Sequence, residues 1–364
     1  MIMKAKALVL KAPKELVLEE FDLPTIGDDD ALIEVEACGL CGTDHEQYSG
    51  ILPTGGPTIP GHETVGRVTE IGETASKRFN VKCGDLVAVE VFQSCRQCDN
   101  CTNNDYRHCK EHGIFDMYGF IPVSKAPGLW GGYATHLYAS KDAMLIKIPE
   151  SLDPQLATLF NPLGAGIRWA VEVPETKKGD IVAILGPGIR GIAGLVATKQ
   201  AGAKFVMVTG YGERDRKRLE YAKLFGADLV VDTQTQDPVK ELRSATGQLA
   251  DVVIDVTAKS TAAFGQSVNL CKDGGKIVIA GTKGTTGAEN LSIDSIIYKE
   301  LTILGALGVD YNSYSKAVEI LDSNEFPFDQ LSRLSIGLND ANNLLSELSE
   351  GKQDALHCLI NPKI

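Results

Sequence analysis

The sequence lacks long apolar runs and basic clusters, and both absences narrow the range of possible partners. No stretch of the chain approaches the roughly 18 consecutive apolar residues that a membrane-spanning helix needs. The formal net charge is −12, and Lys and Arg dominate no segment, which argues against nucleic acid as the main partner. We therefore expect neither a membrane nor a nucleic acid as the main partner.

The N-terminus also lacks the pattern of an export signal. Residues 1–10 form a short strand-like run without a cleavage-site pattern, so we expect no signal peptide. The cysteines are then expected to lie in a reducing compartment, the cytoplasm, where disulfides are disfavoured. Three of the nine cysteines, Cys83, Cys271 and Cys358, are predicted to be small buried side chains.

The length and the element pattern predict two domains. A chain of 364 residues exceeds a typical single core. In the first 150 residues or so, short strands alternate with turns rich in Gly, Pro and Asp, which is typical of an all-β, barrel-like module. The expected strands are residues 5–10, 16–20, 31–37, 63–71 and 86–91.

Four cysteines lie close together at the spacing C-x2-C-x2-C-x7-C: Cys95, Cys98, Cys101 and Cys109. Four thiolates at short spacing can close a tetrahedral Zn²⁺ shell, and a closed shell is typical of a structural metal that folds a lobe. Two disulfides or an iron–sulfur cluster are the alternatives, but a reducing compartment favours zinc.

A second candidate metal site combines Cys41 with the sequence Gly61-His62-Glu63. A thiolate, an imidazole and a carboxylate on separate loops can form an open zinc site, in which water or substrate completes the shell. A buried thiol and a hydrogen-bonded loop histidine are the alternatives for Cys41 and His62 taken singly.

The pattern changes after Pro154 to alternating strands and helices. Residues 180–186 form a continuous apolar run, as in a strand buried on both faces. The following G-x-G-x-x-G sequence opens a helix that is expected to run to about Ala201, and this arrangement is typical of a dinucleotide site. The predicted cofactor-binding residues are Gly186, Pro187, Gly188, Ile189, Arg190 and Gly191.

Further strand–helix units predict a six-stranded, doubly wound sheet. The remaining strands are expected at residues 204–210, 229–232, 251–257, 275–281 and 301–307, with helices near 214–226, 237–246 and 260–271. Near the C-terminus, two amphipathic patterns at 313–321 and 340–348 precede a strand-like tail at 355–360.

The end of the second strand of this sheet bears on the choice of cofactor. NAD enzymes usually place an acidic residue there for the ribose 2′-OH, whereas this chain has Gly210. Arg214, Arg216 or Lys217 could neutralise a 2′-phosphate, which favours NADP(H) over NAD(H). Glu213 could instead reach back to the 2′-OH, so NAD stays an alternative.

Taken together, these motifs resemble those of the zinc-dependent medium-chain alcohol dehydrogenases. The resemblance rests on Cys41-Gly42-Thr43-Asp44, Gly61-His62-Glu63, the four-cysteine lobe and Gly131-Gly132-Tyr133-Ala134, and it covers essentially the whole chain. It implies a GroES-like β-barrel catalytic domain over residues 1–155 with a zinc lobe at about 93–112. It further implies a Rossmann cofactor domain over residues 156–307 and a C-terminal segment, residues 308–364, that goes back to complete the catalytic domain.

The resemblance also implies roles for individual residues. Cys41 and His62 match the catalytic zinc ligands, and Glu63 matches a carboxylate that approaches the metal in some members. Thr43 matches the hydroxyl that hydrogen-bonds the substrate oxygen, and Asp44 matches a carboxylate that orients the histidine ligand.

Two positions depart from the family pattern. Asn161 stands where the family has a third Cys, Asp or Glu ligand, and a neutral amide binds zinc more weakly. We therefore expect Glu63 to complete the shell, with weak binding by Asn161 or a labile zinc as alternatives. Glu46, preceded by His45, stands where many members have the histidine of the proton relay, so either residue could end the relay.

The implied activity is the interconversion of an alcohol and its aldehyde or ketone, by hydride transfer to or from NAD(P). The resemblance implies two zinc ions per chain. It also implies a homodimer or homotetramer, because family members usually pair the last cofactor-domain strand, which is otherwise an exposed edge, across a dimer. Two alternatives remain: a reductase without catalytic zinc, acting for example on an activated double bond, and a nicotinamide-binding protein without catalysis.

Overall fold

The chain folds into two compact units in the computed structural model, which describes residues 4–284, 287–289 and 291–364. The first unit comprises residues 1–160, 318–322 and 328–364, and the second comprises 161–317 and 323–327. The start of the strand-like N-terminal run, Met1 to Met3, lies outside the described residues. The predicted domain boundaries at residues 155 and 307 stay predictions.

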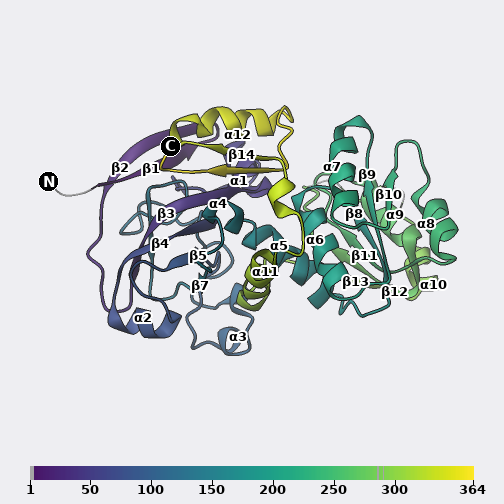
Figure 1. The fold of residues 1–364 in the computed structure, drawn as a ribbon, viewed down its shortest axis with the longest axis horizontal. Coiled ribbons are helices and arrows are strands. Elements are labelled where there is room, and N and C mark those ends of the chain that lie inside the picture. The colour runs from purple at the N-terminus through teal and green to yellow at the C-terminus, as the bar shows by residue number, and fades with distance from the viewer. Residues whose placement is uncertain (1–3, 285–286, 290) are drawn as a thin grey trace. The chain divides into compact units, whose positions relative to one another are not determined.

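The first unit is built on a seven-stranded sheet and a separate two-stranded hairpin (Figure 1). The order along the sheet is β14-β15-β3-β4-β5-β7, with β6 paired to β3. The hairpin consists of β1 (Lys4–Ala12) and β2 (Glu15–Asp22). The sheet strands are β3 (Ala31–Leu40), β4 (Glu63–Ile71), β5 (Leu86–Val89), β6 (His136–Ala139), β7 (Leu145–Lys147), β14 (Arg333–Ile336) and β15 (His357–Ile360).

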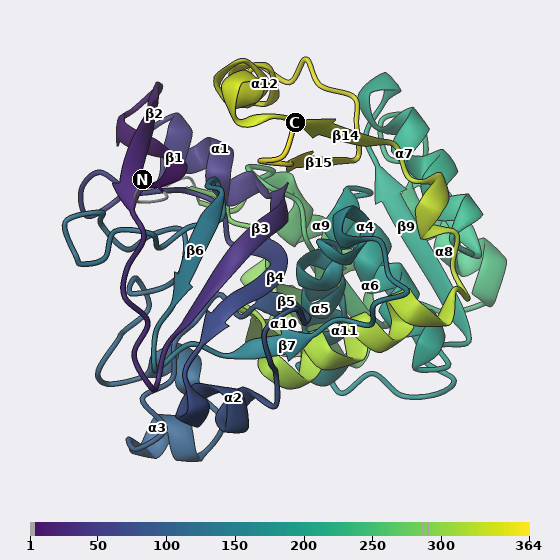
Figure 2. The same cartoon turned by 60° about the vertical axis from the view of Figure 1, so that its left-hand side comes forward.

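The C-terminal segment of the chain completes this sheet. Strand β15 pairs antiparallel with β3, where Cys358 lies opposite Leu40, and β14 pairs parallel with β15. Figure 2 shows α12 (Ala341–Ser349) above these two strands. The helix packs against α1 (Gly42–Tyr48), and the Tyr48 hydroxyl donates to Asn342 Oδ1 at 3.0 Å. Further α-helices that the structure describes in this unit are α2 (Glu73–Phe79), α3 (Asp99–Thr102) and α4 (Pro154–Ala157).

The second unit is a six-stranded parallel sheet in the order β10-β9-β8-β11-β12-β13, as the sequence predicted (Figure 1). Its strands are β8 (Ile181–Leu185), β9 (Phe205–Gly210), β10 (Leu229–Asp232), β11 (Ala250–Asp255), β12 (Cys271–Ile279) and β13 (Thr302–Gly305). Its α-helices are α5 (Phe160–Ile167, from residue 161 on), α6 (Ile189–Gln200), α7 (Glu213–Leu224), α8 (Pro238–Thr246), α9 (Ala262–Leu270) and α10 (Ile293–Tyr298), together with α11 (Tyr311–Ser323) except residues 318–322, which belong to the first unit.

Burial agrees with the apolar pattern of the central strand. All five residues of β8 are buried, as expected for a strand that is covered on both faces. Cys271 and Cys358 are buried as predicted, but the prediction for Cys83 is wrong. Cys83 is exposed because it lies in the turn before β5, where Gly84 adopts a positive φ of 91°. Among the described residues, no helix is long and apolar enough to cross a membrane.

Candidate active site and metal centres

Cys41 lies at the junction between β3 and α1, where it caps the helix. Its backbone is extended (φ −108°, ψ 166°), and its Sγ accepts a hydrogen bond from the backbone N–H of Thr43 at 3.5 Å. The Asp44 carboxylate accepts in return from the backbone N–H of Cys41 at 2.8 Å. This reciprocal arrangement is a capping box, and it fixes the direction in which the Cys41 sulfur points.

Asp44 also reaches the second segment of the candidate site. Its Oδ2 accepts from the backbone of Cys41, and its Oδ1 accepts from the backbone N–H of Gly61 at 3.2 Å. His62 Nδ1 lies 3.6 Å from Asp44 Oδ1, so that interaction is electrostatic rather than a hydrogen bond. One buried carboxylate therefore holds both the Cys41 loop and the His62 loop.

The structure brings Cys41, His62 and Glu63 together. One ligand atom from each of the three side chains lies within 4.8 Å of the others. His62 and Glu63 are buried, and Cys41 is half-buried, so a ligand can reach the cluster from one side. Nδ1 of His62 faces Asp44, which leaves Nε2 as the nitrogen for a metal.

The electrostatics of this cluster suit a cation. Burial alone would lower the pKa of His62, but the Asp44 carboxylate and the Cys41 sulfur raise it well above its ordinary value. The same negative potential raises the pKa of Tyr133, where burial is the largest cause and Asp44 the next. A site that favours an imidazolium also favours a Zn²⁺ ion, and one thiolate with one carboxylate would neutralise that ion.

A missing side chain on the neighbouring strand makes room for Glu63. Gly39 on β3 lies opposite Glu63 on β4, and a Cβ at Gly39 would clash with Glu63 Oε2. The same Cβ position at Gly39 would lie 3.0 Å from Cε1 of His357. His357 is buried, and its Nε2 is hydrogen-bonded to Thr158 Oγ1 at 2.9 Å. His357 is thus held by a hydrogen bond close to Glu63, a position for which the sequence carried no signal.

Thr43, His45 and Glu46 occupy the first turns of α1. The Thr43 hydroxyl lies 3.5 Å from Cys41 Sγ, and all three side chains are half-buried. The structure thus places Thr43 beside the metal-ligating candidate and Glu46 one helical turn further on.

Asn161, in the second unit, has both ends of its side chain engaged. Its Nδ2 donates to the Tyr314 hydroxyl at 2.8 Å, and its Oδ1 accepts from Arg190 Nη2 at 2.9 Å. Arg190 also lies over the Trp169 ring, 5.4 Å from its centroid. An amide oxygen that already accepts from a guanidinium is a poor ligand for a cation, so these contacts favour Glu63 over Asn161 as the third zinc ligand.

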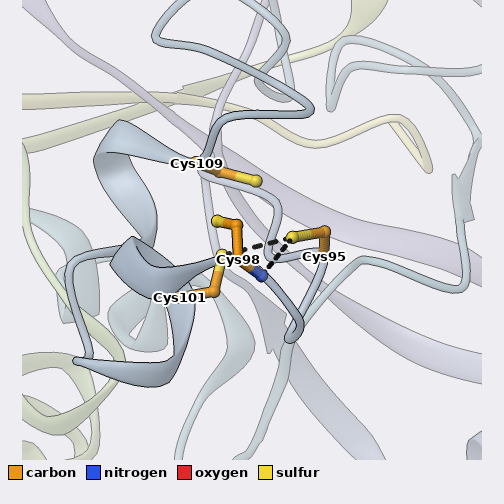
Figure 3. Close-up of side chains that lie close together, drawn as sticks. All are labelled: Cys95, Cys98, Cys101 and Cys109. Carbon is orange, nitrogen blue, oxygen red and sulfur yellow. Dashed lines mark hydrogen bonds between the residues drawn. The ribbon is translucent and has the colours of Figure 1, made fainter.

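The four cysteines of the lobe form the second cluster (Figure 3). Their sulfur atoms all lie within 4.8 Å of one another, and Cys95 Sγ is 3.7 Å from Cys101 Sγ. A disulfide requires about 2.05 Å, and all four cysteines are free thiols here. The spacing is therefore that of four ligands around one ion.

Backbone amides prepare this lobe for a metal. The pKa of Cys98 falls to about 6, mainly because the backbone N–H groups of Lys110 and Cys101 donate to its sulfur. Burial instead raises the pKa of Cys101 to about 12, so binding of a metal to this thiol would release a proton. Arg96, at a positive φ of 60°, ties the lobe to the barrel through the carbonyls of Lys141 and Ala143, at 2.8 and 2.5 Å.

The glycine turn between β8 and α6 has the shape of a dinucleotide cradle. Gly186 has a φ of 106°, which allows the tight turn, and a Cβ at Gly191 would clash with the carbonyl oxygen of Gly186. Nothing lies within 4 Å of a Cβ position at Gly188, which caps α6. The turn thus leaves open space beside the unpaired N–H groups of a helix N-terminus, as a pyrophosphate needs.

The end of β9 cannot hold an acidic side chain in this backbone. A Cβ at Gly210 would lie 2.9 Å from Asp215 Cβ and 3.1 Å from Leu219 Cγ. Asp215 is turned inward, where it accepts from the backbone N–H of Tyr211 at 3.0 Å. Arg214 and Arg216 are exposed on α7, and Arg216 pairs with Glu213 at 3.2 Å.

The glycines of Gly131-Gly132-Tyr133-Ala134 allow this segment to pack directly on the loop before His62. A Cβ at Gly131 would clash with the carbonyl oxygen of Ile59, and one at Gly132 would lie 2.6 Å from Cys38 Sγ. Cys38 is a buried thiol that packs against this segment and is not one of the three residues of the metal cluster.

The aromatic residues that follow the four-cysteine lobe lie in different surroundings. Tyr118 and Trp130 are buried in the core of the barrel. The Phe120 ring instead lies 6.5 Å from the His62 ring, and Phe115 is 63% exposed. Of these four aromatic residues, Phe120 is the one whose ring lies close to a residue of the candidate site.

Comparison with known families identifies the class of this protein. Residues 27–150 match the alcohol dehydrogenase GroES-like domain, and residues 191–323 match the zinc-binding dehydrogenase domain. The chain therefore belongs to the zinc-dependent medium-chain alcohol dehydrogenase family, and it is an oxidoreductase of the alcohol dehydrogenase type with a GroES-like and a Rossmann domain.

Individual relatives support the assignment over the full length. A protein named probable alcohol dehydrogenase from Mycobacterium tuberculosis is 55% identical over 361 residues, which are 98% of each chain. An erythritol/L-threitol dehydrogenase from Mycolicibacterium smegmatis is 30% identical, again over 98% of each chain. A structure from Sinorhizobium meliloti, assigned to the zinc-binding dehydrogenases and bound to NADP, is 26% identical with a TM-score of 0.84, covering 99% of this chain and 100% of that one.

The role of Asp44 leads to a first prediction. Asp44→Ala removes the carboxylate that holds both the Cys41 loop and the His62 loop, so zinc affinity at this site should fall roughly 10- to 100-fold. Competition with a chelator, followed by metal analysis, measures the change, and the lobe zinc should be unaffected.

Asp85 offers the matched control for this measurement. It also accepts a backbone hydrogen bond, from Lys82 at 3.0 Å, but it pairs with Lys147 away from the cluster. Asp85→Ala should leave the zinc affinity unchanged. Equal chelator resistance of Asp44→Ala and the wild type would show that Asp44 does not organise the site.

Proposed function

We propose that this protein interconverts an alcohol and its aldehyde or ketone, with zinc held by Cys41, His62 and Glu63 and with NADP(H) as the favoured cofactor. The observation that carries the proposal is the convergence of these three ligand atoms within 4.8 Å, beside the Thr43 hydroxyl. The relatives named alcohol dehydrogenase and erythritol/L-threitol dehydrogenase act on hydroxyl groups by name, which supports this substrate class.

The donor set fits the metal and the turn fits the cofactor. When bound, zinc would supply a Lewis acid that lowers the pKa of a substrate hydroxyl, and the nicotinamide would supply hydride chemistry. The residues of the chain then bind, orient and move protons. Asp44 keeps Cys41 and His62 in place, and Phe120 provides an apolar surface next to His62.

Proton transfer would begin at the Thr43 hydroxyl. This group lies on the first turn of α1, 3.5 Å from Cys41 Sγ, where it can accept the proton of a substrate hydroxyl and pass its own proton on. Glu46 or His45, on the same helix and half-buried, would receive the proton and release it to water.

The preference for NADP(H) rests on the end of β9. An acidic side chain at position 210 would clash with Asp215 and Leu219, so the usual partner of the NAD ribose is missing there. Arg214 and Arg216 are exposed nearby and can pair with a 2′-phosphate. The NADP found in the Sinorhizobium meliloti structure supports the same preference.

We further propose that the protein forms a homodimer or homotetramer through the edge strand β13. This strand ends the six-stranded sheet, and Ile303 on it is 38% exposed. Ile293, Ile297 and Tyr298 of the adjacent α10 are 65%, 63% and 81% exposed. An apolar, unpaired edge of this kind favours pairing with a second copy.

A substrate panel tests the proposed function. Purified protein loaded with zinc is mixed with primary alcohols, secondary alcohols, polyols and the corresponding carbonyl compounds, and the nicotinamide absorbance is followed with NAD(H) and with NADP(H). We expect turnover on at least one alcohol–carbonyl pair and a higher kcat/KM with NADP(H).

Two outcomes would contradict the proposal. Turnover of an activated double bond alone, with a single zinc per chain, would favour the reductase alternative. Binding of nicotinamide without turnover of any compound would favour a non-catalytic protein.

A further inference from the structure

A buried ion pair lies at the carboxyl end of β11, apart from both metal clusters. Asp255, the last residue of this strand, is fully buried, and Lys283 follows β12 with an 18% exposed side chain. Their Nζ and Oδ1 atoms are 3.0 Å apart. None of the residues placed in the metal sites or the glycine turn takes part in this pair.

Thr257 joins the pair into a compact network. Asp255 Oδ1 accepts from the backbone N–H of Thr257 at 2.9 Å and from its hydroxyl at 2.6 Å. Lys283 donates to the same hydroxyl at 2.7 Å and to the carbonyl oxygen of Thr257. The ammonium thus fastens the loop after β12 to the loop after β11.

This network lies against the glycine turn. A Cβ at Gly186 would meet Thr257 Cγ2 at 3.2 Å, and the backbone N–H of Val256 donates to the Leu185 carbonyl at 3.1 Å. A Cβ at Gly281 would clash with the carbonyl oxygen of Thr257. The carboxyl ends of β8, β11 and β12 therefore meet at Thr257, at the edge of the sheet where doubly wound folds bind ligands.

A second Lys–Asp pair lies at the opposite end of β11. Lys272, on β12, pairs with Asp251 near the start of β11, and the side chains are 45% and 18% exposed. Both pairs connect β11 with the β12 segment, but only Lys283 and Asp255 lie at the ligand-binding edge. A buried pair adds little net stability compared with apolar residues, so stability alone is a weak reason for the Lys283 pair.

We propose that Lys283 is a positioning residue for the nicotinamide half of the bound cofactor and that its charge favours the reduced form. The glycine turn and β9 belong to the half of the sheet that takes the adenosine, so the other mononucleotide lies over β11 and β12. This inference rests on the proposed function as a nicotinamide-dependent enzyme.

The charge has a direction-specific consequence. The oxidised nicotinamide ring is cationic and the reduced ring is neutral, so a nearby ammonium disfavours the oxidised form relative to the reduced form. Asp255 is fully buried, whereas 18% of the Lys283 side chain is exposed, so Lys283 is the member of the pair that a ligand can reach. Lys283 therefore both orders the Thr257 loop and biases the two redox forms.

The test compares dissociation constants for NADPH and NADP⁺, or for NADH and NAD⁺ if the panel shows that preference. Fluorescence titration is applied to the zinc-loaded wild type, Lys283→Arg, Lys272→Met and the double variant Lys283→Met with Asp255→Asn. The double variant removes both charges together, so no unpaired buried carboxylate is left to unfold the protein.

The expected result is a change in the ratio of the two constants. The double variant should bind the reduced cofactor roughly tenfold more weakly than the wild type, which is the effect expected from the loss of one charge-assisted network. Its affinity for the oxidised cofactor should fall by a much smaller factor. Lys283→Arg keeps the charge and should restore most of the wild-type ratio. Lys272→Met, at the opposite end of β11, should match the wild type.

If the double variant kept the wild-type ratio of the two dissociation constants, the inference would be overturned. A lower melting temperature with an unchanged ratio would show that the Lys283–Asp255 pair has a purely structural role. If the wild type bound neither cofactor, the proposed function and this inference would fall together. Wild-type binding with an unaffected double variant would leave the proposed function intact and remove this inference alone.

Discussion

Cys41→Ala is expected to lower alcohol turnover by roughly 10³-fold or more while the fold stays intact, because the site loses a Lewis acid worth several kcal/mol. Cys41 is half-buried at a helix N-terminus and is not a member of the buried core clusters of the first unit, so circular dichroism and the lobe zinc should be unchanged. Steady-state kinetics with the best alcohol from the panel measures the loss, and His62→Ala should behave in the same way.

Cys38 provides a matched control three residues away. It is a fully buried cysteine on β3, and its sulfur contacts the Thr64 hydroxyl at 3.5 Å rather than the metal cluster. Cys38→Ala should therefore keep most of the activity, at a small cost in stability. Full activity of Cys41→Ala would refute the assignment of this cysteine as a ligand.

The second large effect is expected at the lobe. Cys98→Ala removes one of four converging thiolates, so the lobe should lose its zinc, and the free energy of unfolding should fall by several kcal/mol. A loss of that size lowers the melting temperature by roughly 10 °C for a unit of this length. Calorimetry and zinc analysis of the same preparation measure both quantities.

Cys83→Ala is the control for the lobe, since Cys83 is an exposed cysteine of the same unit outside both clusters. It should leave the zinc content and the melting temperature unchanged. If Cys98→Ala retained all of its zinc and its melting temperature, the four cysteines would not form a structural metal site.

The cofactor unit was the most predictable part of the fold. Its strands are continuous apolar runs between glycine turns, and the burial of all five β8 residues shows why such a run specifies a central strand. Strand β14 (Arg333–Ile336) was not predicted, because its polar–apolar alternation spans only four residues, and all four are half-buried in the structure. Cys83 was misjudged because cysteine type predicts burial, whereas the turn that exposes Cys83 is set by Gly84.

The candidate metal ligands could be predicted from the sequence, whereas the contacts that hold them in place could not. Cys41, His62 and the lobe cysteines stand out because metal ligands have characteristic spacing and residue types. The contact of Asp44 with Gly61 and the space that Gly39 leaves for Glu63 depend on how β3 and β4 pair, which no local pattern records. The engagement of Asn161 by Tyr314 and Arg190 likewise joins segments far apart in the chain.

The most direct test of the central claim is anomalous X-ray scattering at the zinc absorption edge, from crystals of the protein purified with zinc. We predict two peaks per chain, one among Cys95, Cys98, Cys101 and Cys109 and one among Cys41, His62 and Glu63. A second peak at any other place, or a single peak confined to the lobe, would contradict the account.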